Sequence, residues 1–81
     1  MNRQDVLSKL QGLFQETFDD DALKVSETTS ADDIDDWDSL SNVRLMIAVE
    51  QAFGIRMRAN EVASLKNTGE LISLVLAKTA A

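Results

Sequence analysis

Residues 38–54 have the sequence DSLSNVRLMIAVEQAFG, which contains a start signal and a stop signal for one helix. The Asp38 carboxylate can accept hydrogen bonds from the first N–H groups of a helix, which have no partner within it. Gly54 can adopt the left-handed backbone conformation that commonly ends a helix. Together these signals predict a helix over residues 39–53.

The apolar side chains of this predicted helix fall on two nearly opposite faces. One face is wide enough to cover a core and comprises Leu45, Met46, Val49 and Phe53. The other face comprises Leu40, Val43 and Ile47. A small bundle seldom buries both sides of one helix. The second face therefore either packs under a long loop or is exposed to a partner or a ligand.

A first helix is predicted over residues 3–18, where apolar residues recur at intervals of three and four. Asn2 is suited to be its N-cap. The segment 19–38 that follows has no helical period and should form a long loop, with room for a short helical turn. Four apolar residues should anchor this loop to the core: Leu23, Val25, Ile34 and Trp37.

The chain after Gly54 predicts two more helices, a short one at about residues 60–65 and a longer one at about 69–78. Asn67 and Glu70 have the spacing of a capping box at the start of the longer one. We therefore predict an all-α four-helix bundle with three longer helices, one short helix and a long acidic loop between the first two. Its size indicates a single domain.

The charge is concentrated in the loop. Segment 19–38 contains nine acidic residues and one basic residue, Lys24, whereas the whole chain has a net charge of −6. Such a segment can be a solvated loop, a cation site or a docking surface for a basic partner. No register of the segment places oxygen ligands and glycine as a calcium-binding hand requires, so no metal site is predicted.

The composition excludes several functions. There is no cysteine and no histidine, which rules out a structural zinc site and a Ser-His or Cys-His catalytic relay. The acidic balance argues against nucleic-acid binding. The longest apolar run, residues 45–49, is far shorter than the roughly 18–20 residues of a membrane span. We expect a cytoplasmic protein that is not itself an enzyme.

The tripeptide Asp38-Ser39-Leu40 opens a two-faced helix after a long acidic loop, and this arrangement resembles the acyl carrier protein family. The resemblance extends over nearly the whole chain, through Val43, Leu45, Ile47-Ala48-Val49-Glu50, Phe53-Gly54, Leu65 and the segment 67–76. It implies that Ser39 accepts 4′-phosphopantetheine from coenzyme A through a phosphopantetheinyl transferase. Asp38 would help to present the serine to that transferase and its Mg²⁺.

The resemblance also implies partners. A carrier of this kind, acting as a monomer, would hold acyl groups as thioesters for acyl-loading, acyl-transferring or condensing enzymes of fatty-acid or polyketide-type biosynthesis. Leu40, Val43 and Ile47 would contact those enzymes, and Arg44 would flank the contact. The alternative is an unmodified acidic helical adaptor that binds partner proteins through Leu40, Val43 and Ile47.

The sequence departs from housekeeping fatty-acid carriers at several positions. Those carriers usually have glycine two residues before the aspartate, and acidic residues where this chain has Ser41 and Arg44. Here Asp36 replaces the glycine, and Glu50 is the only acid between Ser39 and Phe53. These departures favour a dedicated pathway with its own enzymes.

Overall fold

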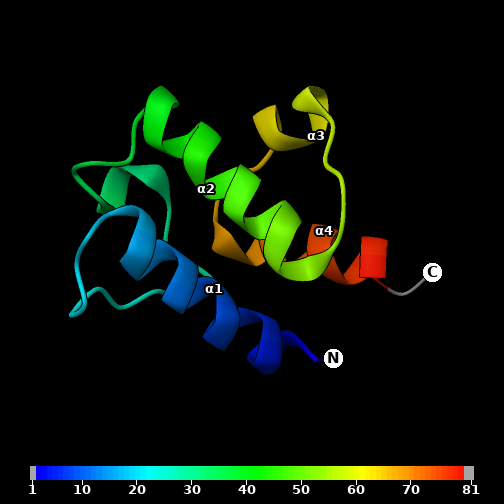
Figure 1. Cartoon of the computed structure of the whole chain (residues 1–81), viewed down its shortest axis with the longest axis horizontal. Coiled ribbons are helices and arrows are strands. Elements are labelled where there is room, and N and C mark those ends of the chain that lie inside the picture. The colour runs from blue at the N-terminus through cyan, green and yellow to red at the C-terminus, as the bar shows by residue number, and fades with distance from the viewer. Residues whose placement is uncertain (1, 80–81) are drawn as a thin grey trace.

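The structure, a computed structural model, describes residues 2–79, and this part of the chain contains four α-helices and no strand. The helices are α1 (Arg3–Thr17), α2 (Ser39–Phe53), α3 (Ala59–Ala63) and α4 (Thr68–Thr79), with a 3₁₀ turn, η1, at Ala31–Asp33. The predicted bundle of three longer helices and one short helix is confirmed (Figure 1). None of the described helices is both long and apolar enough to cross a membrane.

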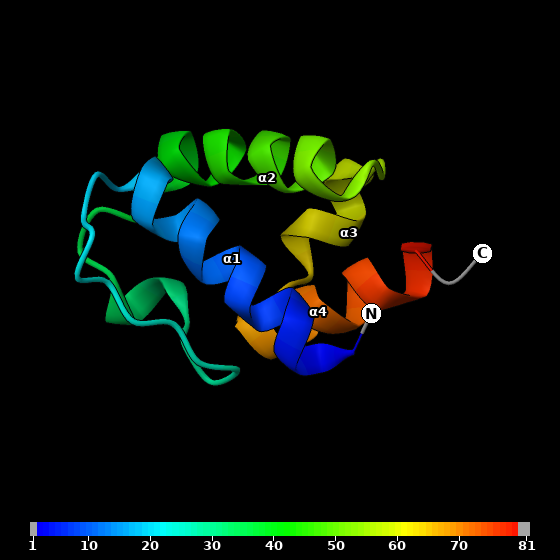
Figure 2. The same ribbon diagram turned by 60° about the horizontal axis from the view of Figure 1, so that its bottom comes forward.

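Helix α1 packs against both α2 and α4, and it runs antiparallel to α2 (Figures 1 and 2). The segment 18–38 passes around one end of this pair (Figure 2). The core comes from all three long helices and from the loop: Val6, Leu10, Phe14, Val25, Ile34, Leu45, Met46, Val49, Leu71, Ile72 and Val75. Two predicted loop anchors, Val25 and Ile34, are buried, and the other two pack against the core, as expected.

The ends of α1 and α2 follow the sequence signals. The Asn2 Oδ1 accepts a hydrogen bond from the Asp5 N–H at 2.8 Å, which caps α1. Helix α1 ends at Thr17, one residue before the predicted end. Gly54 has φ 65°, the left-handed conformation expected at the end of α2.

The predicted bounds of the short helix were wrong, and a polar side chain forms a hydrogen bond at each of its observed ends. Helix α3 spans Ala59–Ala63 rather than about 60–65. The Glu61 carboxylate accepts a hydrogen bond from the Arg58 N–H at 2.8 Å at the start of the helix. The Ser64 hydroxyl donates to the Glu61 carbonyl at 2.9 Å just after its end. Leu65 therefore lies outside the helix and packs against the core.

The capping box predicted for α4 is only half formed. The Asn67 Oδ1 accepts a hydrogen bond from the Glu70 N–H at 3.0 Å, as predicted. The Glu70 carboxylate instead accepts from the N–H of Lys66, one residue before the expected donor. Helix α4 spans Thr68–Thr79, slightly longer than the predicted 69–78.

The acidic loop is attached to the start of α4 mainly through its backbone. The Thr29 carbonyl accepts hydrogen bonds from the Thr68 N–H at 2.9 Å and the Thr68 hydroxyl at 3.0 Å. The Gly69 N–H donates to the Glu27 carbonyl at 2.7 Å, and a Cβ on Gly69 would lie 3.0 Å from that oxygen. Arg3 reinforces this contact by donating to both the Glu27 carboxylate and the Gly69 carbonyl.

Two leucines of α2 provide a matched test of the fold. Leu45 is fully buried, whereas the side chain of Leu40 is 67% exposed. We predict that Leu45→Ala lowers the free energy of unfolding by about 2–5 kcal/mol, because it leaves a cavity in the core. Leu40→Ala should change it by no more than about 0.5 kcal/mol. Urea unfolding of both variants measures the difference, and equal losses would contradict the observed rotation of α2.

Candidate functional site

Ser39 is the first residue of α2, and its side chain is exposed to solvent. Five of the seven serines use their hydroxyl groups in hydrogen bonds within the protein: Ser26, Ser30, Ser41, Ser64 and Ser73. Within residues 2–79, the hydroxyls of Ser39 and Ser8 make no such bond. Of these two, only Ser39 begins a helix, where the N–H groups give the helix end a partial positive charge.

Asp38 holds this end of α2 in place. Its Oδ1 accepts hydrogen bonds from the Leu40 N–H at 3.1 Å and the Ser41 N–H at 3.0 Å. The Ser41 hydroxyl oxygen in turn accepts from the Asp38 N–H at 2.9 Å. The hydroxyl lies within donating distance of two oxygens, the Asp36 carbonyl at 2.8 Å and the Asp38 Oδ1 at 3.1 Å. Residues on both sides of Ser39 are therefore fixed, while the Ser39 side chain itself remains accessible.

These hydrogen bonds favour the ionised form of the Asp38 carboxyl. Donation from the Ser41 backbone and then from the Ser41 hydroxyl lowers the pKa of Asp38, and the Leu40 N–H adds to the effect. At neutral pH the Asp38 carboxylate is therefore ionised and caps α2.

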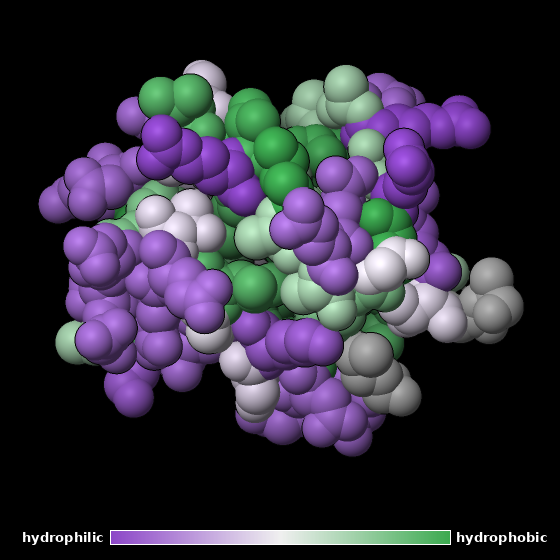
Figure 3. Space-filling view, in the orientation of Figure 1, coloured by the Kyte–Doolittle hydropathy of each residue, from purple (hydrophilic) through white to green (hydrophobic). Residues whose placement is uncertain are grey.

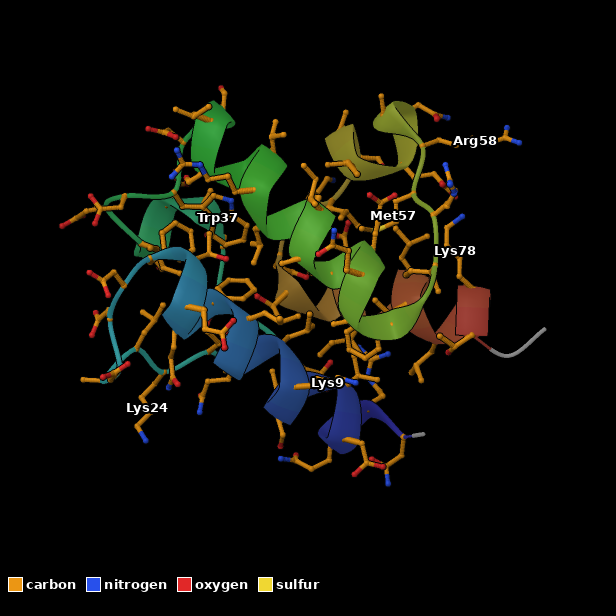
Figure 4. The ribbon with its side chains drawn as sticks, in the orientation of Figure 1. Lys9, Lys24, Trp37, Met57, Arg58 and Lys78 are labelled. Carbon is orange, nitrogen blue, oxygen red and sulfur yellow. The ribbon has the colours of Figure 1, made fainter. Side chains whose placement is uncertain are left out.

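Trp37 connects the loop to α2 immediately before this cap. Its indole N–H donates to the Asn42 Oδ1 at 2.9 Å, and its ring meets the ring of Phe14 edge-on, with centroids 5.2 Å apart. The Trp37 ring also lies 6.2 Å from that of Phe18. In Figure 4 the Trp37 side chain lies between the loop and the first half of α2. This contact fixes the position at which the loop ends and α2 begins, and hence the position of Ser39.

A cavity of about 420 Å³ adjoins Ser39. Its polar lining residues are Asp38, Ser39, Asn42, Lys66 and Asn67. Its larger apolar lining residues come from the loop, α2, α3, the segment between α3 and α4, and α4: Trp37, Met46, Val62, Leu65 and Leu71. An apolar chain attached near Ser39 would find an apolar wall within reach.

The second apolar face of α2 is exposed, so the alternative in which it packs under the long loop is wrong. The side chains of Leu40, Val43 and Ile47 are 67%, 56% and 48% exposed, and we call this set the apolar strip. Figure 3 shows hydrophobic surface along α2 with hydrophilic groups on either side. Arg44 is also exposed, and it follows Leu40 by four residues and precedes Ile47 by three.

The structure brings together Asp38, Ser39 and Leu40 at the start of α2, as the sequence predicted. It adds features that the sequence analysis missed: the bond between Asp38 and Ser41, the bond from Trp37 to Asn42, and the cavity. An N-cap aspartate accepts a hydrogen bond from the N–H of the second or third helical residue, so the first of these could have been found. The cavity depends on how α2, α3 and residues 65–67 pack, for which no local pattern exists.

The cap at Asp38 should make stability depend on pH. Because the pKa of Asp38 is lowered in the folded state, the folded protein binds fewer protons at this carboxyl than the unfolded chain does. The carboxylate therefore adds to the free energy of unfolding above the ordinary aspartate pKa of about 3.9. We predict that the difference in free energy of unfolding between the wild type and Asp38→Ala has its largest value at neutral pH. It should shrink as the pH falls through the lowered pKa.

Urea unfolding at a series of pH values measures this difference. Asp35→Ala is the control for loss of one loop charge, because within residues 2–79 the Asp35 carboxylate makes no hydrogen bond or ion pair. A difference for Asp38→Ala that stays constant down to pH 2 would contradict a role for the ionised carboxylate.

Similarity to known proteins covers nearly the whole chain. The acyl carrier protein of Thermosynechococcus vestitus is 30% identical over 82 residues, with 100% of both chains covered. That of Caulobacter vibrioides is 32% identical, covering 94% of this chain and 97% of the relative. The chain matches no family model.

Solved structures show the same fold. Holo acyl carrier protein from Geobacter metallireducens, determined by solution NMR, superposes with a TM-score of 0.86 at 42% identity, covering 91% of this chain and 85% of that one. The acyl carrier protein of Thermotoga maritima gives a TM-score of 0.85 at 22% identity, covering 99% and 93%, and shows the likeness of fold alone. The chain therefore belongs to the acyl carrier protein family, whose members are carrier proteins and not enzymes.

Proposed function

We propose that this chain, as one carrier domain over residues 1–81, holds acyl intermediates as thioesters on a 4′-phosphopantetheine arm attached to Ser39. It would deliver them to the enzymes of a dedicated pathway. The observation that carries this proposal is the Ser39 hydroxyl, which is exposed, has no hydrogen-bond partner within residues 2–79 and lies at the positive end of α2. The similar structure from Geobacter metallireducens is of a holo form, which supports a covalent arm here as well.

The residues around Ser39 fit such a group. Attachment would join the Ser39 Oγ to the phosphorus next to the pantetheine half of coenzyme A. The bond from that phosphorus to the adenosine bisphosphate would break, and the hydroxyl proton would be lost. The product is a negatively charged phosphodiester, which the N–H end of a 15-residue helix stabilises. The arm supplies a thiol, which a chain without cysteine cannot provide itself.

Asp38 and Ser41 support the attachment site by keeping the first turn of α2 rigid. The carboxylate accepts hydrogen bonds from two N–H groups of that turn, and the Ser41 hydroxyl oxygen accepts one from the Asp38 N–H. We propose that Asp38 thereby presents Ser39 to the transferase in one conformation. Ser41 would not be modified, because its hydroxyl is occupied in the cap.

The cavity beside Ser39 would receive part of the acyl chain. Its apolar wall removes hydrocarbon from water, which stabilises the loaded form by about 25 cal/mol for each Å² of apolar surface buried. A cavity of about 420 Å³ with Lys66 and Asn67 in its wall also has room for polar groups. Tethering then raises the effective concentration of the acyl group at the active site of each partner.

The assignment to a dedicated pathway is supported by the charges of α2. Its only acidic residue is Glu50, whose carboxylate accepts a hydrogen bond from the Met57 N–H at 2.8 Å. Arg44 lies beside the apolar strip, through which Leu40, Val43 and Ile47 would contact the partner enzymes. A helix with so little negative charge is poorly suited to enzymes that recognise acidic carriers.

Incubation with coenzyme A and a broad-specificity transferase tests the proposal directly. We predict that intact mass spectrometry finds one added phosphopantetheine, that Ser39→Ala abolishes the addition, and that Ser8→Ala and Ser41→Ala retain it. Ser8 is the matched control, because its hydroxyl also has no hydrogen-bond partner within residues 2–79. An unmodified chain would favour the alternative adaptor, and a label on any other serine would refute the assignment to Ser39.

The tryptophan provides a test of the cavity. Trp37 is the only tryptophan and lines the cavity, so an acyl chain that enters should displace water near the indole. We predict that fluorescence emission shifts to shorter wavelength when the holo form is loaded with an octanoyl group, and not with an acetyl group. Val62→Phe, which narrows the cavity, should reduce the shift. Identical spectra of the holo and octanoyl forms would contradict acyl entry.

A further inference from the structure

The apolar strip is bordered by arginines at two places. Arg44 lies within the strip's own length, between the turns of Leu40 and Ile47. Arg56 lines a depression of about 400 Å³ at the other end of α2, and Ile47 lines the same depression. Within residues 2–79 the ion pairs join Arg3 to Glu27 and Lys78 to Glu61, so neither bordering arginine is paired with an acid.

The acid that shares this depression with Arg56 already accepts a hydrogen bond. Glu50 lines the same depression as Arg56, but one oxygen of its carboxylate accepts the hydrogen bond from the Met57 N–H. Residues 39–58 contain three arginines and one glutamate, a charge of +2, in a chain whose net charge is −6. The negative charge lies instead in the loop 19–38, where nine acids meet one lysine.

From this separation of charge we infer that the enzymes that receive acyl groups from this carrier have an apolar pocket for the strip, with carboxylates opposite Arg44 and Arg56. This inference rests on the proposed carrier function and specifies its partner. Burial of Leu40, Val43 and Ile47 would provide the contact, and attraction between the rim charges would accelerate association. A partner with lysines or arginines at those places would be rejected by like-charge repulsion.

A charge-swap experiment tests the inference with a defined probe. The probe is a fatty-acid condensing enzyme that docks carriers through a basic surface, together with a variant in which one docking lysine or arginine is replaced by glutamate. Activity of both enzyme forms toward a free pantetheine thioester confirms that each is competent without a carrier. The measured quantity is kcat/KM for the acylated holo carrier with each form.

We expect the wild-type carrier to favour the glutamate form of the enzyme by about threefold to tenfold. The double variant Arg44→Glu/Arg56→Glu should reverse this preference. Lys24→Glu is the control for a single basic-to-acidic change away from the strip, because Lys24 lies on the exposed loop, away from α2 in Figure 4. It should leave the preference unchanged. Raised salt should reduce the preference of every carrier.

Two outcomes would overturn the inference: equal preference for the two enzyme forms in the wild type, or an equal change from Lys24→Glu and the double variant. Failure of the proposed function would be seen separately, as absence of the arm in the mass spectrum. In that case the dissociation constants of the unmodified chain for the two enzyme forms still test the charge preference. Equal constants would refute it.

Discussion

Burial of Leu45, Met46 and Val49 fixes the rotation of α2 about its own axis, and the functional surface follows from that constraint. Once this face is packed on the core, Leu40, Val43 and Ile47 must point away from it. The start of the same helix lies at the surface, where the loop delivers Ser39. One packing contact therefore places both Ser39, the proposed attachment residue, and the apolar strip on a single rigid element, as precise presentation to partners would require.

The sequence was sufficient for features determined by local patterns. The caps at Asn2 and Asp38, the left-handed Gly54 and the two faces of α2 each depend on residues within a few positions of one another. The ends of α3 were not predicted, because the side chains of Glu61 and Ser64 form the hydrogen bonds at the two ends of a helix of only five residues. In so short a helix, side-chain bonds at the ends outweigh the apolar period.

The candidate site likewise has a part that the sequence predicts and a part that it does not. Ser39 and its neighbours in the tripeptide could be selected from the sequence because they form one contiguous motif at a helix start. The cavity could not, because its wall combines Trp37 from the loop, Met46 from α2 and Leu71 from α4. The exposure of the strip also could not be predicted, because the spacing of its residues is compatible both with burial under the loop and with exposure to solvent.

The attachment of the acidic loop to α4 has a consequence for how the protein forms during synthesis. The carbonyl groups of Glu27 and Thr29 bond to Gly69 and Thr68, residues that the ribosome adds some forty positions later. Until those residues emerge, the loop backbone can bond to α1, through Gln11 and Gln15, but not to α4, and its carboxylates repel one another. The hydrogen bonds that hold residues 27–29 against α4 can therefore form only after Thr68 and Gly69 have been translated.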